Sequence, residues 1–414
     1  MDFSLLNITF PKISDKLIKR FFNKEVKAGE IDADLYLETA SQFEEAIDES
    51  IGLDFEYNHP DNVMRAKLRT NLHAFSGAKS LAMFEQIRAE LTNEDGSVRT
   101  FAEFKDKVLD IDLQYNTNWL KTEYNQSVVQ SQHAKNWNRF KEDADLYPNL
   151  KYVTVGDDRV RNDHRALDGI IRPVEDAFWN TYAPQNGWGC RCTLEQMDEE
   201  AELTEIETAR GLGKGVIKQK MFKTNIGKTG IVFEDSHPYF KNAKGLKKQL
   251  KAVENHGMRE YVDIYNKPKK LAKYKAGIKT EEDYVAWFDK KVKNSPNSDK
   301  TGFVLASKIG HKIEFKSMLK DKPSIVKQKR YLYADELDNV VSNPDEVWTR
   351  LDDNPKNNRF ITNYIKYYED VPVILVTTPA NKGNAITVMS YYKLDKNPEQ
   401  GVSRFRQGVL EYRK

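Results

Sequence analysis

Apolar residues in the first third of the chain recur every three or four positions, which places them on one face of a helix. Between Asp15 and about Phe140 the pattern appears in three groups: Phe43, Ile47 and Ile51; Leu68, Leu72 and Phe75; and Phe84, Ile87 and Leu91. Residues 101–147 contain neither glycine nor proline. They predict one long helix, or two with a soft break, that ends before Pro148.

The pattern changes after Pro148. Tyr152, Thr154 and Gly156 mark a short extended piece, and polar loops rich in Asp, Gly, Pro and Asn follow as far as Cys192. Residues 199–251 combine a short acidic helix with a segment punctuated by glycines. The lysine-rich residues 267–300 have few apolar positions, so we expect a domain boundary in or near this stretch.

The C-terminal region predicts one helix and four short strands separated by turn residues. The helix covers 331–341, and the strands cover 347–350, 360–368, 371–378 and 385–393. An antiparallel four-strand meander is the simplest arrangement for these strands. The expected fold class is therefore α+β multidomain, with a helical part at 1–148, a loop-rich module at 149–240, a linker and helical connector at 241–299, and a small α+β domain at 300–414.

Length and composition limit the possibilities further. A chain of 414 residues exceeds what one hydrophobic core normally supports, so two or three domains are expected. Its 65 basic and 63 acidic residues nearly balance, so any basic site must be local. No apolar stretch is long enough to cross a bilayer, and Met1 to Phe10 lacks the features of a signal peptide, which predicts a cytoplasmic chain without a membrane partner.

The loop-rich module carries two distinctive strings. Residues 156–169 read GDDRVRNDHRALDG and residues 186–192 read NGWGCRC, with RPVEDAFW and YAPQ between them. These strings resemble the signature of the phage Mu protein F-like minor head proteins, and LKTEYNQSVVQSQHAKNW at 120–137 and NIGKTGIVFEDSHPYF at 225–240 extend the resemblance to about residues 1–240. The resemblance implies a head-morphogenesis protein of the virion, made in the host cytoplasm, with the portal and other head proteins as partners.

Three residues of this module have the chemistry of metal ligands. His164, Cys190 and Cys192 offer an imidazole and two thiols, which suit zinc or another metal, and Asp157 or Asp168 could complete four-coordination. The single residue between the cysteines is less typical of zinc sites than two to four residues. Two reduced, buried cysteines beside a hydrogen-bonded histidine are the structural alternative, and a catalytic Cys-His pair, or a metallohydrolase built on all three residues, is a further one. The two cysteines cannot supply a disulfide framework.

The C-terminal region is modestly basic. Residues 301–414 hold nineteen basic and fourteen acidic residues, an excess of five positive charges. The segments ELDNVVSNPDEVW at 336–348, YIKYYEDVPVILVTT at 364–378 and NAITVMSYYK at 384–393 resemble the phage members of the barnase-EndoU-colicin-RelE nuclease group. That resemblance implies either a ribonuclease that needs no metal cofactor or an inactive relative used for binding.

A ribonuclease of this kind needs an acid, a base and cations near the phosphate. His311 is the only histidine after residue 300 and is the first candidate for acid or base, although it could also be an ordinary surface histidine. Arg350, Arg359 and Lys366 could bind phosphate or could be solvated charges on the sheet. Thr387 and Ser390 lie on the last predicted strand, where Ser390 and Tyr392 could face substrate.

Two functional hypotheses follow for the whole chain. In the first, a head protein carries a C-terminal ribonuclease whose substrate is RNA. In the second, the C-terminal domain catalyses nothing and binds a protein partner, RNA or packaged DNA.

Overall fold

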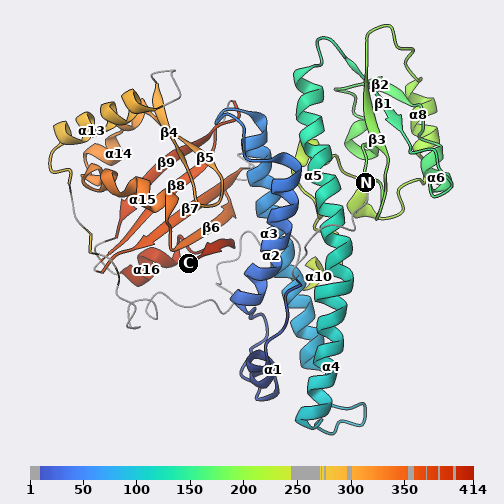
Figure 1. Ribbon diagram of the computed structural model, residues 1–414, viewed down its shortest axis with the longest axis horizontal. Helices are drawn as coiled ribbons and strands as arrows, with labels where there is room; N and C mark the ends of the chain where they lie inside the picture. The colour runs from blue at the N-terminus through green and yellow to red at the C-terminus, as the bar shows by residue number, and fades with distance from the viewer. Residues whose placement is uncertain are drawn as a thin grey trace. The chain divides into compact units, whose positions relative to one another are not determined.

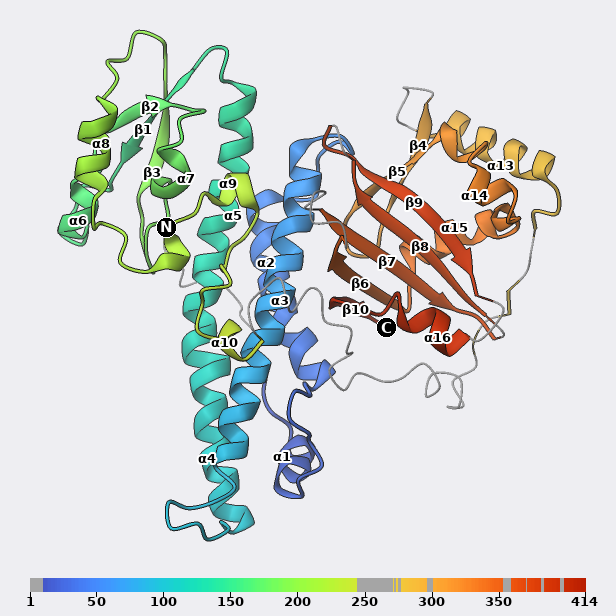
Figure 2. The same ribbon diagram turned by 180° about the vertical axis from the view of Figure 1, so that it is seen from behind.

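The computed structural model describes residues 10–243, 271, 273–274, 277–295, 301–352, 359–369, 371–380, 383–394 and 398–414. The chain divides into two compact units. The first comprises Met1–Glu30, Asp34–Gly52 and Lys67–Leu246, and the second comprises Ile31–Ala33, Leu53–Ala66 and Lys247–Lys414. Both units mix helices with strands, which confirms the α+β class (Figures 1 and 2). Residues 244–270 of the predicted connector lie outside the described residues.

The first third of the chain is helical, as its apolar spacing predicts. Its elements are α1 (Asp15–Phe22), α2 (Ala33–Ile51), α3 (Pro60–Ala89), α4 (Phe101–Leu113), the π-helical turn η2 (Gln114–Trp119) and α5 (Leu120–Glu142). Thr100 and Glu103 begin α4 with a capping box, in which each side chain accepts a hydrogen bond from the other residue's backbone N–H. Helix α4 continues through η2 into α5, so η2 is the predicted soft break.

The loop-rich module forms a small lobe of the first unit. Strands β1 (Asn149–Val153), β2 (Ile171–Pro173) and β3 (Thr193–Met197) make an antiparallel sheet in the order β2-β1-β3. The remaining elements are short: α6 (Asn162–Arg165), α7 (Trp179–Tyr182), α8 (Ile206–Gly213), η3 (Lys220–Phe222), α9 (Ile226–Thr229) and α10 (Phe240–Ala243).

Trp179 anchors the core of this lobe. Its side chain is fully buried, and its indole N–H donates to the Pro173 carbonyl at 2.9 Å. Leu150, Tyr152 and both cysteines are buried in the same cluster. An irregular backbone with little secondary structure can therefore hold one conformation, because a large aromatic side chain fills its centre and its polar tip is bonded.

The second unit is built on a seven-stranded sheet in the order β10-β6-β7-β8-β9-β5-β4. Strands β6 (Glu346–Leu351), β7 (Phe360–Tyr367), β8 (Pro372–Pro379) and β9 (Ile386–Lys393) form the predicted antiparallel meander. Three strands were not predicted: β4 (Gly302–Ala306), β5 (Lys312–Lys316) and β10 (Val409–Arg413). The helical elements are α13 (Glu281–Asn294), η4 (Ser317–Leu319), α14 (Pro323–Val326), η5 (Arg330–Glu336), α15 (Leu337–Ser342) and α16 (Pro398–Ser403).

The two faces of this sheet differ in what covers them. Residues directly opposite on neighbouring strands share a face. The core face carries the row Val347, Tyr364, Leu375 and Tyr391, which packs with residues of α13, α14 and α15. The second face carries the row Leu410, Trp348, Asn363, Val376 and Ser390. Figure 1 shows the helices on the core face, and Figure 2 shows the second face with α16 at its border.

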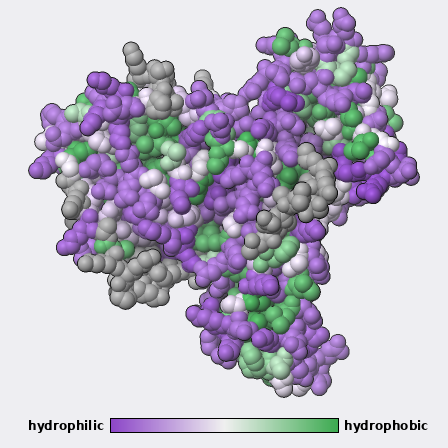
Figure 3. All heavy atoms as spheres, in the orientation of Figure 1, coloured by the Kyte–Doolittle hydropathy of each residue, from purple (hydrophilic) through white to green (hydrophobic). Residues whose placement is uncertain are grey.

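The face of the molecule shown in Figure 3 is mostly hydrophilic. Hydrophobic side chains gather over the end of the first unit that carries α1 and α4, and exposed residues of α4 include Leu109 and Leu113. Among the helices that the structure describes, none combines the length and the apolar character that a membrane crossing requires.

Candidate functional site

The residues predicted for nuclease chemistry lie on both faces of the seven-stranded sheet. Ser390 is in the row that defines the second face, opposite Val376. Thr387 pairs with Thr378, two residues along β8 from Val376, and Arg350 lies two residues along β6 from Trp348. Arg350, Thr387 and Ser390 therefore share the second face. Three strand spacings of about 4.8 Å separate β6 from β9, so the backbone of Arg350 lies roughly 14 Å across the sheet from that of Thr387.

His311 and Lys366 lie on the core side instead. The Nδ1 atom of His311 is 2.9 Å from the hydroxyl of Tyr364, a core-face residue, and the histidine is 1% exposed. Lys366 lies two residues along β7 from Tyr364, and its Nζ donates to the Asn343 carbonyl at 2.7 Å. The thickness of the sheet separates both side chains from Ser390. His311 thus joins the turn between β4 and β5 to β7, and Lys366 joins β7 to the residue that follows α15.

Arg359 stands at the β6–β7 end of the sheet. Its Nε donates to Asp352 at 2.9 Å, and its carbonyl accepts from the Asp352 backbone N–H at the same distance. These two bonds hold the end of β6 against the start of β7. The structure does not bring Arg359 to Ser390.

Arg330 was not among the residues predicted from the sequence, and its side chain bonds to Ser390 on the second face. Arg330, the first residue of η5, donates from Nη1 to the Ser390 hydroxyl at 2.6 Å. Its guanidinium lies 4.1 Å from the ring centroid of Tyr392, and Gln328 accepts from its Nε at 2.9 Å. Hydrogen bonds and stacking thus hold a planar cation beside a serine hydroxyl and an aromatic ring.

The segment after α16 adds a second cation at the same place. The guanidinium of Arg404, an exposed residue, lies 5.8 Å from the Tyr392 centroid, and Phe405 packs beside that ring with the centroids 5.3 Å apart. We call Arg330, Ser390, Tyr392 and Arg404 the arginine-tyrosine cluster. Two positive charges around a half-buried ring suit a phosphate with an attached base.

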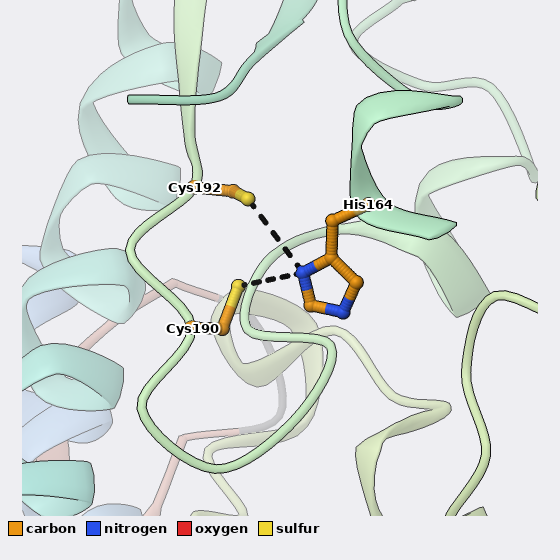
Figure 4. Close-up of side chains that lie close together, drawn as sticks. All are labelled: His164, Cys190 and Cys192. Atoms are coloured by element: carbon orange, nitrogen blue, oxygen red, sulfur yellow. Dashed lines mark hydrogen bonds between the residues drawn. The ribbon is translucent and has the colours of Figure 1, made fainter. Parts of the chain in front are cut away.

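A second group of reactive side chains lies in the small lobe of the first unit. His164 comes from α6, and Cys190 and Cys192 come from the loop that leads into β3. The His164 Nδ1 is 3.5 Å from the Cys190 sulfur and 3.8 Å from the Cys192 sulfur, and both thiols point toward the imidazole (Figure 4). All three ligand atoms lie within 4.8 Å of one another, and all three residues are buried.

The two cysteine thiols affect each other's pKa. The hydrogen bond from Cys192, together with that from His164, holds the pKa of the Cys190 thiol well below its usual value, although burial opposes this. The hydrogen bond with Cys190 raises the pKa of the Cys192 thiol. Burial and the negative charge on Cys190 raise it further. Cys190 is therefore the thiol that loses its proton first. Burial lowers the pKa of the nearby His133 to about 4, so that imidazole is neutral at physiological pH.

A pocket opens onto this His-Cys group. Its wall includes Val155, Val160 and Gly189, together with the three arginines 159, 161 and 191. Arg191 makes two bonds to the Asp157 carboxylate, of 2.7 and 2.6 Å, and lowers the pKa of that group to about 2. The site is thus reached from solvent past positively charged side chains.

Two family models match this sequence. Residues 79–195 match the model of phage Mu protein F like proteins, and residues 291–413 match the model of phage-Barnase-EndoU-ColicinE5/D-RelE like nuclease2. The chain thus joins a Mu F-like region to a nuclease-like region. Both resemblances stated from the sequence are confirmed. The first region includes the His-Cys group, and the second includes the arginine-tyrosine cluster.

Two curated relatives match the Mu F-like part. The chain is 30% identical over 126 residues to the putative capsid assembly protein F of Escherichia phage Mu, covering 30% of this chain and 28% of that protein. It is 38% identical over 82 residues to the Mu-like prophage FluMu F protein of Haemophilus influenzae, covering 20% of each. The chain therefore matches less than a third of either relative's length. No solved structure matches it.

Proposed function

We propose that this chain is a phage head protein whose second unit is a ribonuclease that needs no metal cofactor, with the arginine-tyrosine cluster as its active site. The observation that carries the proposal is the hydrogen bond from Arg330 to Ser390 beneath the Tyr392 ring. The match of residues 291–413 to a nuclease model supports it.

The cluster has the cations that stabilise a phosphate during RNA cleavage, and solvent water serves as proton acceptor and donor. The ribose 2′-oxygen attacks the adjacent phosphorus and releases its proton to water, and the bond to the 5′-oxygen breaks as that oxygen takes a proton from water, which leaves a 2′,3′-cyclic phosphate and a 5′-hydroxyl. Arg330 and Arg404 stabilise the negative charge that grows on the phosphate oxygens. Ser390 positions a phosphate oxygen, and Tyr392 stacks on a base. Arg350 and Thr387 extend the contact along the second face.

The decisive experiment measures cleavage of RNA oligonucleotides by the full-length chain in buffer containing a chelator. We expect Arg330→Ala to slow cleavage about 100-fold or more, because one fixed donor to a developing charge contributes on that order. Ser390→Ala should also slow it. Lys327→Ala removes an exposed charge from the same segment and serves as the matched control, with its rate unchanged.

Two outcomes would reject the ribonuclease assignment. The wild-type chain could leave all RNA substrates intact, or Arg330→Ala could cleave as fast as the control. A further variant, His311→Asn, separates the two faces of the sheet. If it abolishes cleavage without lowering the melting temperature, the active site lies at His311 and the arginine-tyrosine cluster is the wrong assignment.

The head role rests on the Mu F-like region. One relative of that region is named a capsid assembly protein. We propose that the chain is carried in the virion head and contacts the portal or other head proteins there. Leu109 and Leu113 of α4 are exposed and four residues apart, so they share one side of the helix and suit a protein partner.

The second candidate function for the second unit is binding without cleavage. Arg330 is already bonded to Ser390 and Gln328, so the cluster could hold an RNA strand or packaged DNA as a static clamp. Binding of intact RNA, weakened by Arg330→Ala and by added salt, would favour this candidate when no cleavage is seen.

A further inference from the structure

We propose that His164, Cys190 and Cys192 bind one zinc ion in a tetrahedral site whose fourth ligand is water, and that the ion fastens the 156–192 loops to the small lobe. The proposal concerns the first unit and does not depend on ribonuclease activity.

The spacing of the three ligand atoms fits the ion. Zinc lies about 2.3 Å from sulfur and about 2.0–2.1 Å from imidazole nitrogen in tetrahedral sites. These bond lengths put a nitrogen and a sulfur about 3.6 Å apart, and two sulfurs about 3.8 Å apart. The His164 Nδ1 lies 3.5 Å from the Cys190 sulfur and 3.8 Å from the Cys192 sulfur (Figure 4). Both nitrogen–sulfur distances therefore fit a tetrahedral site, and all three ligand atoms lie within 4.8 Å of one another.

The chemistry of the three ligand atoms favours zinc. Two thiolates and an imidazole are soft or intermediate ligands that favour zinc over magnesium or calcium. Two thiolates also neutralise the charge of a divalent zinc ion, so the filled site can remain buried at little electrostatic cost. The three residues are at most 4% exposed.

The surroundings keep the ligands in position. The loop before α6 is tied to the Cys-Arg-Cys segment by the two bonds between Arg191 and Asp157. Arg165 donates to the Asp157 carbonyl at 2.7 Å, and Arg161 donates to the Trp188 carbonyl at 2.5 Å. These bonds preorganise a site whose members are 26 and 28 residues apart in the sequence.

The pocket described above supplies the fourth position. It is lined by all three ligands and reaches solvent, so a water molecule can complete the coordination. Three protein ligands and one open position differ from the closed four-ligand sites of zinc fingers.

The full-length chain, purified without added metal, should contain about one zinc ion by elemental analysis. Cys190→Ser with Cys192→Ser should reduce this at least tenfold, whereas His59→Gln, which removes a histidine from the second unit, should leave it unchanged. Chelation should lower the melting temperature of the first unit, because bound metal contributes folding free energy.

Cobalt provides a readout that does not depend on how the variants fold. Cobalt added to the metal-free wild-type chain should give the visible bands of a tetrahedral site and the near-ultraviolet band of a thiolate-cobalt bond. Absence of these bands, or zinc content equal in the wild type and the double-serine variant, would overturn the proposal. The three residues would then be a hydrogen-bonded part of the core.

Discussion

Replacing Arg406 with methionine should destabilise the second unit by about 3–5 kcal/mol, because the change leaves a buried carboxylate without its cation. Arg406 and Glu346 are only 4% and 5% exposed in their side chains, and the Arg406 Nε donates to Glu346 at 2.8 Å. The indole of Trp348 and the hydroxyl of Tyr367 donate to the same oxygen, at 2.9 and 3.2 Å. The pair lies in a network that joins the segment after α16 to β6 and β7.

Urea unfolding followed by tryptophan fluorescence measures this effect. Arg404→Met is the control, since it removes an exposed guanidinium two residues away and should change stability by less than about 1 kcal/mol. Combining Arg406→Met with Glu346→Leu should restore part of the loss, since no charge is then left buried. A loss below about 1 kcal/mol for Arg406→Met alone would show that the pair is hydrated and not an internal support.

Lys79→Met should cause a comparable loss, about 3–5 kcal/mol, in the first unit. Lys79 in α3 donates to Glu123 in α5 at 2.5 Å, and both side chains are at most 4% exposed. The Tyr239 hydroxyl donates to the other Glu123 oxygen at 2.9 Å. Burial lowers the pKa of Lys79, while the Glu123 carboxylate opposes that shift. Removing the ammonium group leaves Glu123 with one hydrogen bond and no opposite charge.

Amide hydrogen exchange along α3 and α5 tests this prediction in the intact chain. Protection in both helices should fall in Lys79→Met and should recover in part when Glu123→Leu is added. Lys121→Met, an exposed substitution on α5, is the matched control and should leave protection unchanged. Equal exchange in Lys79→Met and the control would contradict the account of this buried pair.

The sequence predicted the parts of the fold that repeat locally. Apolar residues three and four apart identified the helices, and the alternating strands of the meander lie within two residues of their expected ends. Strands β4 and β5 escaped prediction because each is only five residues long. β4 pairs with β5, and β5 joins the sheet through a parallel pairing with β9, more than 70 residues later, between Ile313 and Ile386. Such distant pairing leaves no local signal in β5.

Residue chemistry was a weaker guide to the second unit's site. Histidine as a residue type suits proton transfer near neutral pH, but nothing in the sequence indicates that the His311 imidazole packs against Tyr364 on the core face. The irregular register between Val376 and Thr377 also alters which residues of β9 share a face. Arg330 lies 60 residues from Ser390, so only the folded chain brings the two together.

For the His-Cys group, residue chemistry was a better guide than for the second unit's site. His164, Cys190 and Cys192 were chosen for their chemistry, and the structure places all three ligand atoms within 4.8 Å. The short Cys-Arg-Cys spacing seemed unfavourable for zinc. In the fold, both thiols turn toward the imidazole (Figure 4). The intervening Arg191 bonds to Asp157.

We propose that one chain carries a head-protein region and a nuclease region into the virion. Quantitative mass spectrometry of purified particles from cells that produce this chain tests it most directly. We predict peptides from residues 79–195 and 291–413 in equal amounts and at few copies per particle. Intact particles that lack both sets of peptides, or that hold only the first, would contradict the claim.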